Sequence, residues 1–288
     1  MFELFMFAAP ASVYPTALAG LLGLIFGSFL NVVIHRMPKM MQRESDNYVA
    51  EESGKPLPHT DRYDLMEPRS ACPHCQHQIT ALENIPVFSY LYLRGKCIQC
   101  KAAISARYPS VELLTAALTA YLVWHFGSGV VGLASVLFTF FLIAMTFIDM
   151  DTQLLPDDLT LPLLWCGLLV NLHGAIVPLN EAVVGAIAGY LCLWSVYWLF
   201  KLVTGKEGMG YGDFKLLAAL GAWLGWKMLP VIVLLSSLVG AIVGIGLIVL
   251  AKRGRHIPMP FGPYLAAAGM LALIYGKAIM LAYLGYVL

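Results

Sequence analysis

Two acidic residues stand at the edges of long apolar segments, and they are the strongest candidates for chemistry. Asp149 ends one apolar run in TFIDMD, and Asp213 opens another in GYGDFK. An ionisable side chain at such a boundary predicts a function, since charge is costly in hydrocarbon. Two carboxyl groups held close together cannot both ionise cheaply, so one keeps its proton. Such a pair supplies a general base that activates water and a general acid that assists the departing amine of a peptide.

Other acids compete for this role, namely Asp151, Asp157, Asp158 and Glu207. LLPDD is typical of a helix start, where Asp157 or Asp158 would serve as the N-cap. Asp149 and Asp213 are preferred because each directly abuts an apolar segment, on the same side of the expected membrane. Only Asp213 follows glycines, and Gly210 and Gly212 would let a substrate backbone approach. Lys215 is expected in the same loop, either acting electrostatically on Asp213 or reaching towards the interface.

Transport is the alternative function, because membrane carboxylates also bind cations or relay protons. A transporter would place its acids at mid-membrane, often within broken helices of matching repeats. Here both acids lie at segment ends, which favours a protease. For Asp149 alone, an interfacial acid satisfied by a helix N-terminus is also possible. Serine and zinc peptidase chemistry is disfavoured, since the serines of LLSSL have no His or Asp nearby and H-E-x-x-H is absent from the sequence.

Four cysteines form a second constellation of two C-x-x-C pairs, made by Cys72, Cys75, Cys97 and Cys100. Two thiolates from each of two tight turns can close a tetrahedral shell around zinc. Disulfides or free thiols are the alternatives, and an expected reducing compartment disfavours disulfides. Four protein ligands leave no open position, so the zinc would be structural. Gly95, in RGKC, stands where a knuckle turn needs a permissive backbone.

Composition places both constellations in a membrane protein. The 288 residues are 59% hydrophobic and only 12% charged, and the mean hydropathy is +0.75, which excludes an ordinary soluble domain. Helices are expected to span the bilayer, since no alternating strand pattern appears. Segments long enough to cross it number about eight, near 11–34, 110–127, 129–148, 159–178, 182–203, 213–227, 228–251 and 260–287.

The charge distribution divides the chain and orients it. Ten of the 18 Lys and Arg fall in residues 35–108, which predicts an aqueous domain between the first two membrane helices. We therefore expect an all-α polytopic membrane protein made of a first transmembrane helix (1–34), a cytoplasmic zinc domain (35–108) and a transmembrane protease bundle (109–288). Within the second part, 41–69 is polar and is expected to be a mobile excursion.

Basic residues in alternate loops predict the orientation. Lys201 and Lys206, and the AKRGRH segment at 251–256, lie on the same side as the 35–108 domain. The positive-inside rule makes that side cytoplasmic and puts the N-terminus outside. The first apolar segment is expected to be a retained helix, because it lacks a basic n-region and a cleavage signal. A net charge of +1 gives no reason to expect nucleic acid as a partner.

Pairs of glycines four residues apart recur in the apolar segments, at Gly23 and Gly27, Gly185 and Gly189, and Gly240 and Gly244. Small residues at this spacing let helices pack closely. We expect a compact bundle from them, and no oligomeric state is assigned.

A resemblance joins these features. GMGYGDFK contains the G-x-G-D signature of intramembrane aspartyl proteases, and the whole set resembles the bacterial type IV prepilin peptidase family. The motifs run in order along nearly the full chain: GSFLNVVIHRMP, the paired cysteines, NIPVFSYLYLRGKC, ISARYPSVE, IDMDTQLLPD, GYGDFK and PFGPYLA. The resemblance implies that Asp149 and Asp213 are the catalytic aspartates of an enzyme of the bacterial inner membrane.

The same resemblance implies the substrates. These are precursors of type IV pilins and type II secretion pseudopilins, which carry a short basic leader ending in glycine before a hydrophobic helix. Cleavage at the cytoplasmic face between that glycine and the next residue, usually Phe, is followed in members with the cysteine domain by N-methylation from S-adenosylmethionine. The chain shows no Gly-rich fingerprint for that donor, so methylation follows from the resemblance alone. The region around Arg94, Gly95 and Lys96 is where we expect it, together with 27–38, unless the insert docks the leader or stiffens that face.

A presenilin or signal peptide peptidase type of protease also has G-x-G-D and is a related alternative. That group pairs the signature with Y-D, whereas this chain has Ile148 before Asp149. It also lacks a double C-x-x-C insert, so we expect the prepilin peptidase type.

Overall fold

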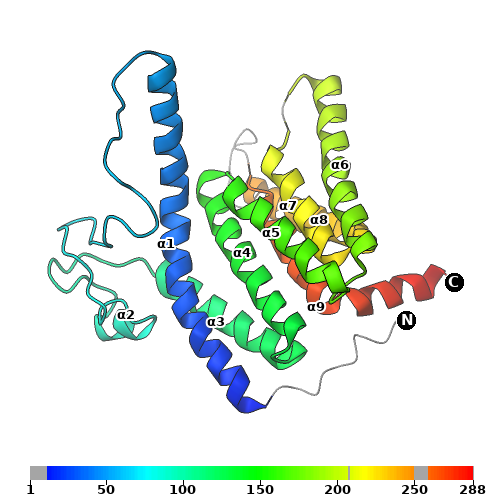
Figure 1. Cartoon of the computed structure of the whole chain (residues 1–288), viewed down its shortest axis with the longest axis horizontal. Coiled ribbons are helices and arrows are strands. Elements are labelled where there is room, and N and C mark those ends of the chain that lie inside the picture. Colours follow the sequence, from blue (N-terminus) through cyan, green and yellow to red (C-terminus); the bar gives the residue numbers. More distant parts are fainter. Residues whose placement is uncertain (1–11, 207, 250–258, 288) are drawn as a thin grey trace. The chain divides into compact units, whose positions relative to one another are not determined.

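The computed structural model describes residues 12–206, 208–249 and 259–287, and helices form most of these ranges except 53–106, where loops and turns surround the short helix α2 (Figure 1). Regular strands are absent from this described part, where β pairing is limited to two isolated bridges. The helices are α1 (Val13–Glu52), α2 (Phe88–Tyr92), α3 (Arg107–Phe126), α4 (Val130–Thr152), α5 (Asp157–Val170), α6 (Leu179–Thr204), α7 (Tyr211–Leu224), α8 (Leu229–Val249) and α9 (Gly262–Val287). The expected all-helical class is confirmed.

Within the described ranges, five helices are long and apolar enough to cross a membrane: α1, α4, α6, α8 with the turn before it, and α9. The helices α5 and α7 have 14 residues each, about 21 Å at 1.5 Å per residue. That is short of the roughly 30 Å of a hydrocarbon core. The count of about eight spanning segments is therefore not exact, since α3, α5 and α7 are not among these five helices. For α7 the physical reason is burial, because a short helix buried within a unit is as apolar as a spanning one.

Helix α1 does not end at residue 34 as expected but continues to Glu52. Its polar second half is rich in helix-forming residues, and Gln42 Nε2 donates to Asp46 Oδ1 one turn along, at 2.8 Å. The chain then returns along the helix, where Arg36 Nη1 donates to the Asp64 carbonyl at 2.8 Å. The expectation of a mobile excursion over 41–69 thus did not include a helix over 41–52, and its mobility stays a prediction.

Glycines let α1 and α3 approach at backbone distance. A Cβ atom at Gly23 would lie 2.7 Å from Ala116 Cα, and one at Gly27 would lie 2.7 Å from Glu112 Cα. No side chain fits in such a contact, so the small-residue spacing does act as a packing face, as predicted from the sequence.

Contacts among the described residues divide the chain into two compact units, one within residues 12–144 and the other within residues 145–287. The first unit holds α1, α2, α3 and most of α4. The second runs from the end of α4 to α9 and contains both candidate aspartates. The expected domain limits at 34 and 108 stay predictions.

Helix α7 lies at the centre of the second unit, in contact with α5, α6 and α9. A Cβ at Gly221 would lie 2.1 Å from the Gly185 carbonyl oxygen of α6, so the two backbones touch. Asn171 fixes the far end of α7, since its Nδ2 donates to the carbonyl groups of Ala222 and Trp223 at 2.9 and 3.0 Å. The helix that carries Asp213 is thereby held at both its side and its end.

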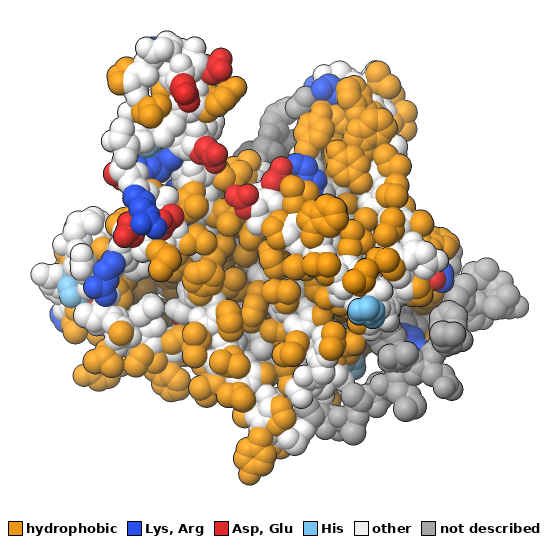
Figure 2. Space-filling model, viewed as in Figure 1, with side chains coloured by type: hydrophobic (Ala, Val, Ile, Leu, Met, Phe, Trp, Pro, Cys, Tyr) orange, Lys and Arg blue, Asp and Glu red, His pale blue; other side chains and the backbone are white. Residues whose placement is uncertain are grey.

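Hydrophobic side chains dominate the visible surface (Figure 2). Large apolar residues stay exposed along spanning helices, including Leu18, Ile25, Leu133, Ile187, Leu234 and Ile242. An apolar exterior of this extent suits a chain whose surroundings are lipid instead of water.

Candidate active site and cysteine cluster

Asp149 lies in the last turn of α4 and is buried, with 5% of its surface exposed. The backbone N–H of Gly262, the first residue of α9, donates to its Oδ2 at 2.8 Å. A Cβ at position 262 would lie 2.7 Å from the same oxygen. Only glycine at this position lets the backbone come so close to the carboxyl group.

Asp213 lies in the first turn of α7 and is also buried, with 7% of its surface exposed. Gly210 is the N-cap of the helix, in extended conformation, and its backbone hydrogen-bonds to the Asp213 carboxyl group. Among the described residues, Asp213 Oδ1 has no hydrogen-bond partner. A buried oxygen without a partner is costly in a finished structure, so this atom is suited to meet a water or a substrate.

The structure brings the two acids into one site. The charge of Asp149 acts on Asp213, and Leu155, from the α4–α5 connection, lies against the glycine beside each of them. A Cβ at Gly262 would lie 3.2 Å from Leu155 Cδ1, and one at Gly212 would lie 2.6 Å from Leu155 Cβ.

The two glycines before Asp213 differ in what faces them. Leu155 occupies the space beside Gly212, whereas a Cβ at Gly210 would meet only Asp213 Oδ2, at 3.8 Å. Open space for a substrate backbone therefore lies beside Gly210, and access to Gly212 requires Leu155 to move.

Lys215 turns away from this pair towards α5. Its Nζ lies 2.6 and 2.7 Å from the two carboxylate oxygens of Asp157. Asp157 is the first residue of α5, and Pro156 is the N-cap without a side-chain cap bond. The expected N-cap role of Asp157 or Asp158 is therefore wrong, and Asp157 instead ties the start of α5 to α7.

Sequence reasoning missed Gly262 and Leu155 as site residues. PFGPYLA and IDMDTQLLPD contain them, but neither motif shows which residue faces an aspartate. A glycine followed by proline at the start of an apolar segment was the available signal, since it marks a constrained backbone near a helix start.

The four cysteines of the insert converge, with their sulfur atoms all within 4.8 Å of one another. Cys72 Sγ lies 3.7 Å from Cys100 Sγ, and Cys75 Sγ lies 3.9 Å from Cys97 Sγ. Four sulfurs bound at about 2.3 Å around a tetrahedral ion would stand about 3.8 Å apart. All four thiols are free of disulfides, so the donor set and its spacing fit a metal ion.

Two matching turns present these sulfurs. In the first, Cys72 N–H donates to the His77 carbonyl and Gln76 N–H donates to the Cys72 carbonyl, both at 2.9 Å. Cys97, Lys101 and Ala102 repeat this pattern in the second turn, so each C-x-x-C pair lies in a tight turn, as predicted from the sequence. Backbone hydrogen bonds from Cys75 and His74 lower the pKa of Cys72 to about 7, which favours the thiolate that a metal requires.

The residues expected near methyl transfer lie between α2 and the second turn. Gly95 is buried at a φ of +67°, and a Cβ there would lie 2.9 Å from the Tyr90 hydroxyl. Its permissive backbone is thus required, as predicted. Arg94 and Lys96 flank it with exposed side chains.

A helical membrane protein with two buried aspartates at neighbouring helix ends belongs, by fold and site, with the aspartyl peptidases of membranes. Comparison with known proteins narrows this class. The profile of the bacterial peptidase A24 N-terminal domain matches residues 21–126, and that of the type IV leader peptidase family matches residues 136–245. The chain belongs to the type IV leader peptidase family.

Relatives support this along nearly the full length. The chain is 60% identical over 278 residues to a prepilin leader peptidase/N-methyltransferase of Aeromonas salmonicida, covering 94% of each chain. It is 57% identical over 267 residues to that of Pseudomonas aeruginosa, with 92% of each covered. The Burkholderia pseudomallei protein is 52% identical over 276 residues, which cover 94% of this chain and 88% of the relative. No solved structure matches the chain significantly.

Proposed function

We propose that this chain removes the leader peptide from type IV prepilins and type II secretion pseudopilins and then N-methylates the new N-terminus. The observation that carries the peptidase half is the pair of buried aspartates, with Asp149 held by Gly262 and Asp213 Oδ1 left without a partner among the described residues. Family membership and the names of the relatives support both halves. The transport and presenilin-like alternatives are not favoured.

The geometry assigns a role to each acid. Both carboxyl groups accept a backbone hydrogen bond, Asp149 from Gly262 and Asp213 from Gly210, but only Asp213 keeps an oxygen without a partner among the described residues. A buried oxygen without a partner is less costly on a neutral carboxyl group than on a charged one, so Asp149 is assigned as the carboxylate that takes a proton from water and Asp213 as the acid that keeps its proton. The resulting hydroxide adds to the scissile carbonyl carbon, and Asp213 gives its proton to the nitrogen as the C–N bond breaks. No acyl-enzyme forms, because water and not a side chain attacks the carbonyl carbon. The dyad gains one proton at Asp149 and loses one from Asp213, so it still holds one proton in total.

The surroundings of Asp213 support cleavage at a membrane face. Tyr197 Oη accepts from Lys201 Nζ at 3.2 Å and lies 3.4 Å from Tyr211 Oη. Aromatic and lysine side chains together are typical of the membrane–water interface. A leader extending into water would meet the dyad there while the apolar pilin segment stays in lipid.

The membrane and the orientation in this proposal have different grounds. Membership of the type IV leader peptidase family favours the bacterial inner membrane. Basic residues in alternate loops favour an orientation with the N-terminus on the periplasmic side and the acids and cysteines on the cytoplasmic side. One of these loops, 250–258, lies outside the described residues.

The insert supplies the second activity in this proposal. Zinc is the ion that four cysteine thiolates at this spacing suit best, and it would hold the two turns together without taking part in the reaction. S-adenosylmethionine would be the methyl donor. Arg94, Gly95 and Lys96 are the residues we place nearest to methyl transfer.

Cleavage of a purified prepilin tests the first half. Asp149→Asn and Asp213→Asn should each lower the rate by about 10²-fold or more, with methylation of an already cleaved pilin intact. Asp158→Asn, a change of an exposed acid in α5, should cleave normally. If either folded variant retains cleavage, Asp149 and Asp213 are not the catalytic pair, and transport becomes the better hypothesis for these acids.

Transfer of labelled methyl groups to cleaved pilin tests the second half. Arg94→Gln and Lys96→Gln should lower this transfer while leader cleavage stays at the wild-type rate, and Lys101→Gln should change neither. If Arg94→Gln instead raises KM for cleavage and leaves methylation unchanged, the insert docks the leader, and the methyl-transfer assignment of this region fails.

A further inference from the structure

An apolar surface on the cysteine insert is unused by the functions proposed above. Phe88, Leu91 and Tyr92 are spaced i, i+3 and i+4 along α2, which puts them on one helical face. Their exposed fractions are 65%, 65% and 86%, so most of this face is left uncovered by the described part of the chain.

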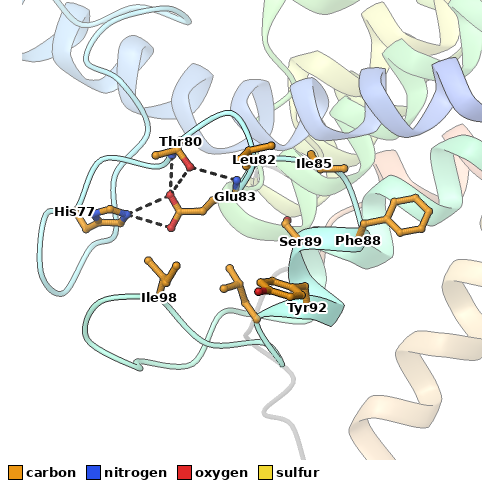
Figure 3. Close-up of a pocket in the computed structure, with 10 residues that line it drawn as sticks. His77, Thr80, Leu82, Glu83, Ile85, Phe88, Ser89, Tyr92 and Ile98 are labelled. Atoms are coloured by element: carbon orange, nitrogen blue, oxygen red, sulfur yellow. Dashed lines mark hydrogen bonds and ion pairs between the residues drawn. The ribbon is translucent and has the colours of Figure 1, made fainter.

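A hollow of about 480 Å³ continues this face. Figure 3 shows Phe88 and Tyr92 of α2 together with Leu82 and Ile85 of the preceding loop and Ile98 of the second cysteine turn around it. The one carboxylate at its edge, Glu83, is already engaged by Thr80 and His77. The hollow therefore offers apolar contact with no unsatisfied charge.

The position of α2 within its unit sets its depth. Val87, directly before α2, donates its backbone N–H to Glu112 Oε2 at 2.8 Å. Glu112 is buried against α1, where a Cβ at Gly27 would lie 2.7 Å from its Cα. Gly27 stands seven residues before Ile34, the last residue of the apolar run of α1, or about 10 Å along the helix axis. The hydrogen bond thus holds the start of α2 near the depth of Gly27, which lies further into the membrane than Ile34, the end of the apolar run.

We propose that α2 and the hollow beside it are a bilayer-contact surface, with α2 lying in the lipid interface and acyl chains covering Phe88, Leu91 and Tyr92. Interfacial helices bury their apolar face about 5–10 Å into the headgroup and acyl boundary, which is the depth that the Glu112 link gives. Residues 70–106 carry three basic side chains, Arg94, Lys96 and Lys101, against the single acid Glu83. That balance complements anionic headgroups.

Photocrosslinking in nanodiscs of phosphatidylethanolamine and phosphatidylglycerol tests this surface with the full chain. p-Benzoylphenylalanine replaces Tyr92 in one variant and Leu91 in a second, and Glu52 at the far end of α1 in the control. Mass spectrometry should find lipid adducts at positions 91 and 92 at several-fold higher yield than at 52.

Equal yields at 92 and 52, or no lipid adduct at 91 and 92, would overturn the proposal. Adducts of positions 91 and 92 with added prepilin, in place of adducts with lipid, would also overturn it, because the face would then be a protein-docking site. Prepilin cleavage by each variant is measured alongside, and since the proposal does not depend on the peptidase assignment, the two can fail separately.

Discussion

The backbone N–H of Gly262 bonds to the carboxylate of Asp149 at 2.8 Å, across 113 positions of sequence. This bond links the start of α9 to the end of α4. It orients the Asp149 carboxyl group through a backbone N–H. A backbone donor, unlike a side-chain donor, cannot turn away by adopting another rotamer. The arrangement makes Gly262 a positioning residue for the proposed peptide hydrolysis.

Gly262→Ala should therefore impair cleavage without unfolding the chain. The new Cβ would meet Asp149 Oδ2 at 2.7 Å, so the carboxyl group must move, and a misplaced catalytic group costs about 10²-fold in rate. The measurement is kcat and KM on purified prepilin, with the loss expected in kcat. Gly246→Ala is the matched control, because nothing lies within 4 Å of a Cβ at that position. Wild-type kcat in Gly262→Ala would show that the contact is incidental.

The Lys215–Asp157 pair should contribute little to cleavage. Its side chains are 29% and 54% exposed, and ion pairs of this exposure contribute about 0–1 kcal/mol. Lys215→Gln and Asp157→Asn should each leave the prepilin cleavage rate within about fivefold of wild type, and the double variant should be no worse than either single one. A loss of 10²-fold confined to Lys215→Gln would instead give the lysine a direct role.

Loss of the metal should follow loss of a single sulfur. Cys72→Ser or Cys97→Ser should reduce bound metal, measured by elemental analysis of the purified chain, from one ion per chain to far below one, because three thiolates close the shell incompletely. Cys192→Ser, in α6, is the control and should retain the ion. Full metal content in both insert variants would contradict a four-cysteine centre.

Substitution at the α1–α3 contact should destabilise the first unit. Gly27→Val places a side chain where Glu112 Cα would lie 2.7 Å away, and overpacking of this kind costs about 1–3 kcal/mol. Thermal unfolding in detergent should show a lower Tm than wild type. Gly20→Ala is the milder comparison, since its Cβ would meet Ala120 Cβ at 3.4 Å, an ordinary contact. An unchanged Tm for Gly27→Val would mean that the helices separate at no cost.

The cysteine cluster and the aspartate pair could be predicted from sequence because their residues lie in short, recognisable motifs. Cys72 and Cys75 lie in one tight turn, and Asp213 follows its own glycines. Gly262 and Leu155 could not be identified, since their partners are set by how distant helices pack. The end of α1 was misplaced because polar residues such as those from Met41 to Glu52 suit a solvated helix as well as a loop. The count of about eight membrane helices is not exact, since α3, α5 and α7 are not among the five long apolar helices of the described residues, and α7 is apolar because it is buried within its unit.

The length of α1 has a mechanical consequence. Its 40 residues extend over about 60 Å, roughly twice the thickness of a hydrocarbon core. One rod therefore joins the membrane interior, where Gly23 and Gly27 fix its contact with α3, to the loop that Arg36 and Arg43 hold against its polar half. Pro38 is the proline inside it, one missing hydrogen bond in an otherwise continuous ladder. If α1 tilts about its contact with α3, its distant end at Glu52 moves further than the residues at the contact, because displacement grows with distance along the helix.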